Sequence, residues 1–549
     1  MRSRALSLSF LLSWAVACAV GPRYEPPEIP VPKTWQESPA AELTANVPML
    51  EHWWTVFHDP ILDRLVARAV LGNLDLEIAA ARIREARGAR GIAASAGLPQ
   101  ASVQGAYFRS KRSDAVPPFK SAPGEGAPFG AREQNAFEAG FDATWEIDVF
   151  GGVRRDKEAA LAQVQAAEEA RRDVLVTLLA DVARSYVELR TAQRQLQILE
   201  QTLRSEGDTL ELAKARLEGG LGTELDVARA EGLLAANTAQ RPTLERFARE
   251  AVHRLGVLLG KDPGALASEL ETPGHLPTAP PEVPLTLPSE LLSRRPDLRR
   301  AERELAAATA RIGVARADLF PRFSIVGGFG RRSEEAGDLS AGDSQFWTIL
   351  PRVQWPIFSG GRIRANIRVQ GARQEQALRQ YEKAVLLALE EVENALSAHT
   401  RELRREESLR VAVTANQRAL ELAMDRYTSG LESFLSVLDA ERSVYAAQDQ
   451  LAQSQRNAVV SLISVYKSLG GGWPFVPDRE ASRTASLALA ALREDDQVEL
   501  GGVVFRLHRH RLWQRDGQPL AFERLGPLLA ERHLQRAGAV LEDCEPLIE

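Results

Sequence analysis

The sequence is poor in several residue types, and each shortage excludes a class of protein. Only two cysteines, Cys18 and Cys544, occur in 549 residues, which rules out a disulfide framework or a zinc site built from four thiolates of this chain. Aromatic residues make up 6% of the chain and methionine occurs three times, so the composition favours long helices over many small cores. No dense basic run stands out and the net charge is −6, so the sequence predicts no nucleic-acid partner.

Motifs for catalysis and cofactor binding are also missing. The chain has no glycine loop spaced to cradle a phosphate, no helical His-Glu pair at metal-ligand spacing and no nucleophile motif. His508, His510, His533 and Cys544 match no known spacing of zinc ligands. We therefore expect a protein that is not an enzyme, with no cofactor and no metal site.

The dominant pattern is a seven-residue apolar repeat across 153–219, which predicts one very long helix. Its positions are Leu175, Val182, Leu189, Leu196, Leu203, Leu210 and Leu217. No proline interrupts the run, and a helix of this length would reach roughly 100 Å. A second long helix is predicted over 362–429, with repeat positions Val385, Val392, Val413, Leu420 and Tyr427. His399 and Glu406 interrupt this second repeat, and we expect them to face water.

Four segments alternate apolar and polar residues as strands do. They are 100–110, 135–149, 321–331 and 345–358. In the second segment an apolar face with aromatics at both ends lies opposite an acidic face formed by Glu138, Asp142, Glu146 and Asp148. This pattern favours a membrane barrel, with lipid outside and water inside, so the four carboxylates are predicted to face the lumen. A soluble sheet with one wet face is the alternative.

The second half of the chain repeats the first. Asp75-Leu76 to Pro99 recurs as Asp297-Leu298 to Pro321, and the turns that follow the two long helices also align at a constant offset. Each half predicts short helices, a strand, a loop, a strand, a very long helix, a tight turn and a returning helix. The expected segments are a first repeat 53–262 with return helix 224–260, a linker 263–288, a second repeat 289–476 with return helix 433–470, and an extension 477–549 in which Val498 to Leu507 form one strand.

The N-terminal region has the features of an export signal followed by a tether. Arg2 and Arg4 precede a short apolar stretch that cannot comfortably span a bilayer. We predict a signal peptide over 1–17 and, because 18–52 is rich in proline, an extended tether there. Ala15-Val16-Ala17-Cys18 resembles a bacterial lipobox, in which Cys18 would be acylated. Cleavage by an ordinary signal peptidase, with Cys18 unmodified, is the alternative.

Together these features resemble the outer-membrane efflux protein (TolC-like) family, in the lipoprotein branch that serves resistance-nodulation-division pumps. The residues that carry the resemblance are the Cys18 box, Gly21-Pro22-Arg23-Tyr24, Trp53-Trp54 with Phe57 and Asp59-Pro60, Asp297-Leu298 to Phe320-Pro321, Trp355-Pro356-Ile357-Phe358, Gly360-Gly361, and Arg426-Tyr427 through Gly430 to Leu438-Asp439-Ala440. The fold class that this implies is mixed and mainly α: a homotrimer in which each chain gives four strands to a β-barrel in the outer membrane, continuous with a long periplasmic α-helical barrel. Four strands cannot close a barrel and open edges are not tolerated in lipid, so association of copies follows from the strands as well.

The function implied by the resemblance is that of the outer-membrane channel of a tripartite efflux system. It would give passive exit to substrates delivered by an inner-membrane resistance-nodulation-division pump and a periplasmic adaptor, and a lipid on Cys18 would anchor it in the outer membrane. The family closes its channel where the helix hairpins converge. The matching residues are Tyr427, Glu432, Asp439, Arg216, Glu224 and Asp226.

Alternatives remain at the level of residues and of function. Carboxylates near a helix N-terminus also stabilise the helix dipole, and that structural role is the alternative for Asp226 and Asp439. The other functions are the outer-membrane duct of a type I protein secretion system, a structural coiled-coil envelope protein, and an enzyme carried by the extension.

Overall fold

The computed structural model describes residues 19–37, 50–111, 133–279, 288–473, 497–500, 503–508 and 511–514. The chain divides into two compact units, Met1–Asn46 with Trp54–Gly471 and Val47–Trp53 with Gly472–Glu549. The predictions for the signal peptide 1–17, for Cys18 and for the zinc-like residues of the tail lie outside the residues whose side chains are described.

The smaller unit contains a three-stranded antiparallel sheet in its C-terminal part. Its strands are β5 (Gln497–Leu500), β6 (Val503–His508) and β7 (Arg511–Gln514), in the order β5-β6-β7. The prediction of a single strand from Val498 to Leu507 is therefore wrong. The two residues between β5 and β6 are glycines, and a glycine pair between two apolar runs is a hairpin signal.

The larger unit is built mainly from helices. They are α3 (Pro60–Gly72), α4 (Leu74–Ser95), α5 (Gly152–Glu218), α6 (Glu224–Thr238), α7 (Arg241–Leu258), α8 (Ala267–Leu270), α9 (Pro288–Arg294), α10 (Pro296–Ala317), α11 (Arg362–Thr428) and α12 (Phe434–Ser468), with short 3-10 turns at η2 (Ala336–Ser340) and η3 (Gly342–Ser344). None of the described helices combines the length and the apolar character needed to cross a membrane.

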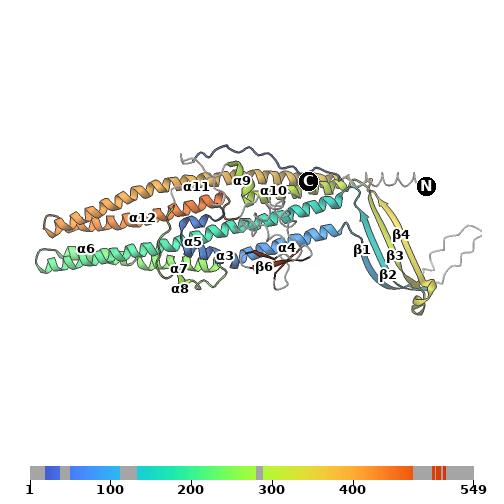
Figure 1. Ribbon diagram of the computed structural model, residues 1–549, viewed down its shortest axis with the longest axis horizontal. Coiled ribbons are helices and arrows are strands. Elements are labelled where there is room, and N and C mark those ends of the chain that lie inside the picture. The colour runs from blue at the N-terminus through green and yellow to red at the C-terminus, as the bar shows by residue number, and fades with distance from the viewer. Residues whose placement is uncertain are drawn as a thin grey trace, which may run out of the picture. The chain divides into compact units, whose positions relative to one another are not determined.

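Glycine permits the sharp entry into each long helix. Gly151 and Gly361, directly before α5 and α11, adopt φ values of 78° and 83°, a left-handed conformation that costs glycine little. The repeated glycines of the two halves therefore serve the same local purpose. At the other end, Figure 1 shows the tight turns from α5 to α6 and from α11 to α12 lying away from the strands.

The first return helix is not continuous, so the prediction of one helix over 224–260 is wrong. α6 ends at Thr238 and α7 begins at Arg241. Pro242 lies in the first turn of α7, where it has no N–H to donate to Thr238 and its ring would clash with that carbonyl in a continuous helix. The matching α12 runs unbroken over 35 residues.

The strands of the larger unit form one antiparallel sheet in the order β1-β2-β3-β4. Their bounds are β1 (Gln100–Lys111), β2 (Glu133–Ile147), β3 (Arg322–Ser333) and β4 (Gln345–Gln354). The fold class, mainly helical with a four-stranded sheet, is confirmed. β4 ends at Gln354, before Pro356, so the strand predicted to reach 358 is shorter than expected; the Trp355 indole N–H instead donates to the Leu319 carbonyl at 3.0 Å.

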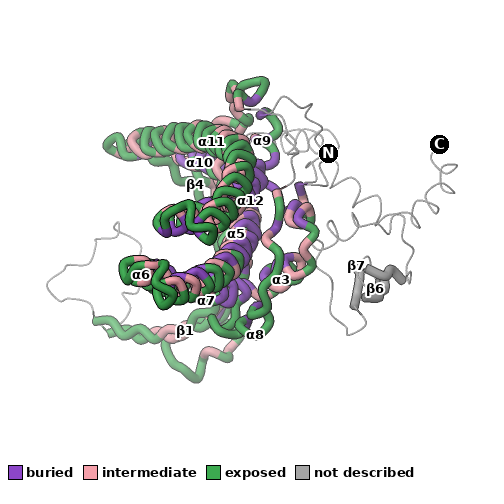
Figure 2. Tube along the Cα trace, turned by 90° about the vertical axis from the view of Figure 1, so that its left-hand side faces the viewer, coloured by how far each residue is buried: buried purple, intermediate pink, exposed green. Residues whose placement is uncertain are grey.

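Many more residues are buried on α5 than on α11, as Figure 2 shows. Val182 and Leu189 of the α5 repeat are fully enclosed, whereas Leu217 near the turn is exposed. His399 is only 3% exposed, so the prediction that it faces water is wrong. Its Nδ1 lies 3.1 Å from the Ala458 carbonyl of α12, because α12 covers α11 at this level.

The N-terminal stretch 19–37 has no helix or strand, as its prolines predict, but it is not a free tether. Tyr24 donates to Glu302 Oε1 of α10 at 2.8 Å, and the Gln36 amide donates to Glu393 Oε1 of α11 at 2.9 Å. Apolar side chains of this stretch pack on the core around Leu298 and Val385. The segment after Cys18 is therefore bound along the helices.

Candidate functional site: the polar sheet face and the hairpin tips

The strand register separates the sheet into an apolar face and a polar face. Phe141 of β2 lies opposite Phe329 of β3, and Phe329 lies opposite Trp347 of β4. These three rings are exposed, and Trp347 is 71% exposed. Ile349, beside Trp347 on the same face, is 67% exposed. No layer of the described chain covers them. A face of this kind suits lipid contact.

The polar face carries balanced charge, which was not expected from β2 alone. Glu138, Asp142 and Glu146 of β2 share it with Arg332 and Arg322 of β3 and Arg352 of β4. Arg332 lies directly opposite Glu138 and donates to its carboxylate at 2.6 Å. The three arginines were missed as site residues. Their alternation with the apolar residues of β3 and β4 was the sequence signal for them.

Asp148 lies outside the sheet. β2 ends at Ile147, and the Asp148 carboxylate accepts hydrogen bonds from the Val153 and Arg154 amides at 3.1 and 2.9 Å, at the first turn of α5. Its prediction as the fourth lumen residue of the strand is therefore corrected: it fixes the turn from strand to helix. Arg154 Nε, 3.3 Å from the same carboxylate, completes this contact.

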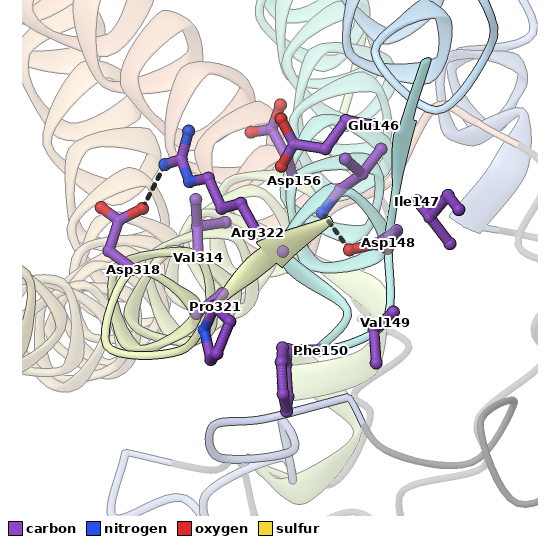
Figure 3. A pocket seen from close by; sticks show the side chains of 13 residues that line it. Glu146, Ile147, Asp148, Val149, Phe150, Asp156, Val314, Asp318, Pro321 and Arg322 are labelled. Carbon is purple, nitrogen blue, oxygen red and sulfur yellow. Dashed lines mark hydrogen bonds and ion pairs between the residues drawn. The ribbon is translucent and has the colours of Figure 1, made fainter. Parts of the chain in front are cut away.

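A pocket of about 240 Å³ lies where the sheet meets the helices. Glu146, Asp148, Asp156 and Asp318 line it together with Arg322. Figure 3 shows Arg322 reaching from the start of β3 to Asp318, with an Nη2 to Oδ1 distance of 2.5 Å. Carboxylates thus outnumber cations at this junction, in contrast to the rest of the polar face.

At the opposite end of the helices, Arg216 joins the two hairpins. Its guanidinium carbon lies 4.6 Å from the centre of the Tyr427 ring, and Nη1 donates to the Tyr427 and Thr428 carbonyls at 3.1 and 3.2 Å. Tyr427 packs on Phe434 with ring centres 5.2 Å apart. Its buried hydroxyl has no hydrogen-bond partner among the described residues. The ring and the backbone of Tyr427 therefore make its contacts.

The remaining predicted tip residues make their hydrogen bonds and ion pairs with residues outside this pair. Asp226 makes a capping box with Thr223 at the start of α6, which is the structural role left open for it. Glu432 accepts from the Ser436 hydroxyl at 3.0 Å, and this bond, with the Ser433 backbone and Arg426, lowers the pKa of the Glu432 carboxyl. Asp439 faces Arg442 at 3.7 Å on the exposed side of α12.

Comparison with known proteins identifies the family. A family model described as outer membrane efflux protein matches residues 65–261 and 287–471. The chain belongs to this family. It is 33% identical over 491 residues to the toluene efflux pump outer membrane protein TtgC of Pseudomonas putida, covering 89% of this chain and 99% of that protein. It is 34% identical to the outer membrane protein OprJ of Pseudomonas aeruginosa, covering 86% and 97%.

A solved structure agrees with this assignment. The outer-membrane channel OprN matches with a TM-score of 0.76 and 35% identity, over 83% of this chain and 100% of that chain. The expected family, fold class and outer-membrane location, with extension into the periplasm, are therefore confirmed, and the protein is an efflux component. The family model covers both repeats and ends before the extension.

Proposed function

We propose that this outer membrane efflux protein is the exit channel of a tripartite system. Three copies form a continuous tunnel, and substrates enter it from a periplasmic adaptor and an inner-membrane resistance-nodulation-division pump. The observation that carries the proposal is a sheet with one polar and one exposed apolar face, joined directly to two long helices. The channel has no energy source or catalytic step of its own.

The sheet edges support assembly from several copies. β1 and β4 are the outer strands, and each pairs on one side only within the described chain. Unpaired N–H and C=O groups are not tolerated in the hydrocarbon region, so another copy must supply the next strand. In the closed barrel, Glu138, Asp142 and Glu146 line the lumen together with the three arginines of the polar face.

A gate at the hairpin tips accounts for closure. Arg216 and Tyr427 hold the first hairpin against the second within each chain. Glu432, Asp439 and Glu224 are exposed in one chain, so three-fold symmetry would arrange each as a ring that attracts cations. Asp226, already satisfied by Thr223, contributes to the gate by fixing the start of α6.

The position of the residues after Cys18 supports a lipid anchor on that cysteine. The Val20 amide donates to the Phe150 carbonyl at 3.1 Å, and Ala19 lies against Gly151. The residues directly after Cys18 are thus held at the junction of sheet and helices. An acyl chain on Cys18 would enter the membrane at the level where the strands begin.

Single-channel recording in planar bilayers tests this function. The purified protein should conduct ions, and Arg216→Ala should raise the open probability several-fold because the hairpins lose a cation-π contact and two hydrogen bonds. Tyr427→Phe should change little, since the hydroxyl makes no bond. Arg229→Ala, an exposed arginine on α6, is the matched control.

Native mass spectrometry in detergent tests the assembly and should give the mass of three copies. A monomer, a protein that passes no ions, or an Arg216→Ala variant that gates like wild type would contradict the proposal.

A further inference from the structure

A pair of glutamates is buried where the first hairpin meets α12. Glu206 of α5 is 2% exposed and Glu441 of α12 is 4% exposed. Asn237 of α6 donates to Glu206 Oε1 at 2.5 Å. Thr209, one turn along α5 from Glu206, donates to Glu441 Oε1 at 2.6 Å. The two carboxyl groups therefore lie in one polar cluster between α5, α6 and α12. We call Glu206 and Glu441 the glutamate pair.

Neither carboxyl group is fully satisfied. Glu206 Oε2 and Glu441 Oε2 are both buried without a hydrogen-bond partner among the described residues. Two like carboxylates in an interior of low dielectric cannot both remain ionised at little cost, and a proton on one of them relieves the repulsion. Burial, and then the charge of Glu206, raise the pKa of Glu441 to about 7, while burial raises the pKa of Glu206.

The neighbouring groups do not offset the cost of burying two carboxylates together. Arg442, next to Glu441 on α12, lowers the pKa of Glu206, as does the bond from Asn237. The Tyr445 hydroxyl of α12 donates to Gln240 Oε1 at 2.8 Å, and its pKa is raised by burial and by the charges of Asp449 and Glu206. Ser205 and Thr209 of α5 bond Glu441. Arg442 thus acts on Glu206, while its ion pair is with Asp439 at 3.7 Å.

The position of the glutamate pair links it to the hairpin tips. Ala213 of α5 and Leu438 of α12, each one to two turns closer to the tip, belong to the apolar cluster that contains Tyr427 and Phe434. The pair and the tip cluster therefore share the interface between α5 and α12. A change in the spacing of these helices at Glu206 would act directly on the packing of Tyr427.

We propose that Glu206 and Glu441 form a proton-dependent latch between the two hairpins of one chain. With a proton on Glu441 the pair carries a single charge. The bond from Thr209 to Glu441 then holds α12 against α5, and the bond from Asn237 to Glu206 holds α6 against α5. When the proton leaves, two buried like charges push the helices apart and loosen the tip cluster. The effect on the channel rests on the proposed function, whereas the latch itself does not.

The sign of the pH effect follows from the raised pKa values. Because the folded state holds its proton more tightly than the unfolded state, the stabilisation is present at acid pH and is lost as pH rises through about 7. The open probability of the channel should therefore increase several-fold from about pH 5.5 to about pH 8.5.

Infrared difference spectroscopy of the full-length protein tests the latch. Titration of wild type should remove the carbonyl stretch of a protonated carboxyl group with a midpoint near 7. Glu441→Gln should abolish that signal and flatten the pH dependence of thermal stability. Glu206→Gln should lower its midpoint, because burial of Glu441 remains while the charge of Glu206 is gone. Glu211→Gln, which changes an exposed glutamate on the same helix, should leave both unchanged.

The outcomes separate the latch from the channel. Absence of the wild-type signal, its persistence in Glu441→Gln, or an unchanged midpoint in Glu206→Gln would overturn the latch, and the wild-type titration needs no variant to fold. A titrating signal with an open probability that does not depend on pH would overturn the coupling to the tips. A protein that shows the infrared titration but never conducts would contradict the proposed function and leave the latch intact.

Discussion

The two long helices are equal in length but not in environment. α5 and α11 each span 67 residues, and every position of the α5 repeat has a counterpart in α11 at a constant offset. α5 is surrounded by α4, α7, α10 and α12, whereas α11 packs mainly on α10 and α12. α11 leaves Leu386 and Val411 exposed at 67% and 64%. Val385 and Val392 of the α11 repeat are buried too, so the exposed apolar residues of α11 lie off the repeat, on a surface available to a further copy.

A carboxylate introduced into each long helix should reveal the largest difference between them. Val182 of α5 is fully buried, so Val182→Asp should prevent folding, because an unpaired buried carboxylate costs several kcal/mol. Leu386→Asp on α11 should leave the helical content of the chain intact but prevent the trimer. Circular dichroism measures the first effect and native mass spectrometry the second.

Gln380→Asp, at an exposed polar position of α11, is the control and should still assemble. A trimer formed by Leu386→Asp would show that this surface of α11 is not an interface.

The return helices give a second contrast, of intermediate size. Ala452 of α12 is the counterpart of Pro242 by the offset that aligns the two hairpin turns. Ala452→Pro should destabilise the chain by about 3 kcal/mol or more, since it breaks a continuous helix. Pro242→Ala, at a break that already exists, should change stability by less than about 1 kcal/mol. Thermal unfolding followed by circular dichroism measures both, and equal effects would contradict the explanation of the α6–α7 break.

The smallest effect concerns His399, which occupies in α11 the repeat position that Leu189 occupies in α5. Burial lowers the pKa of His399, so the unfolded chain binds the proton more readily. The contribution of His399 to stability should fall as pH drops below about 6.5, by at most about 1.4 kcal/mol per pH unit, which is opposite in sign to the contribution of Glu441. His399→Leu should remove this acid-side loss in urea unfolding curves, while His253→Leu, at an exposed site, should retain it. A wild-type acid dependence that survives in His399→Leu would assign it to another group.

Prediction from the sequence succeeded where a residue pattern within one segment determines the structure of that segment. The apolar repeat gave the long helices, the alternation of β2 gave its two faces, and the glycines before Arg362 gave the entry into α11. It failed at α6 and α7, although Pro242 was visible, because the apolar spacing on both sides of the proline resembles one helix.

The candidate site was predicted in part. Arg216 and Tyr427 do meet, whereas Asp148 caps a helix and Glu138 has an arginine partner. The pattern of β2 could show which residues share a face, but not which residues of β3 and β4 stand opposite them.

The amino-acid sequence by itself determined the helices, the strands, the two-faced sheet and the duplicated order of elements, because each depends on residues close together in the chain. Only the tertiary structure decided that α5 is enclosed while α11 is open, that His399 is buried, and that Glu206 and Glu441 are buried in one polar cluster. These outcomes depend on which helices lie side by side. Residues more than two hundred positions apart then come within hydrogen-bond distance, as Thr209 and Glu441 do, and no local period encodes that pairing.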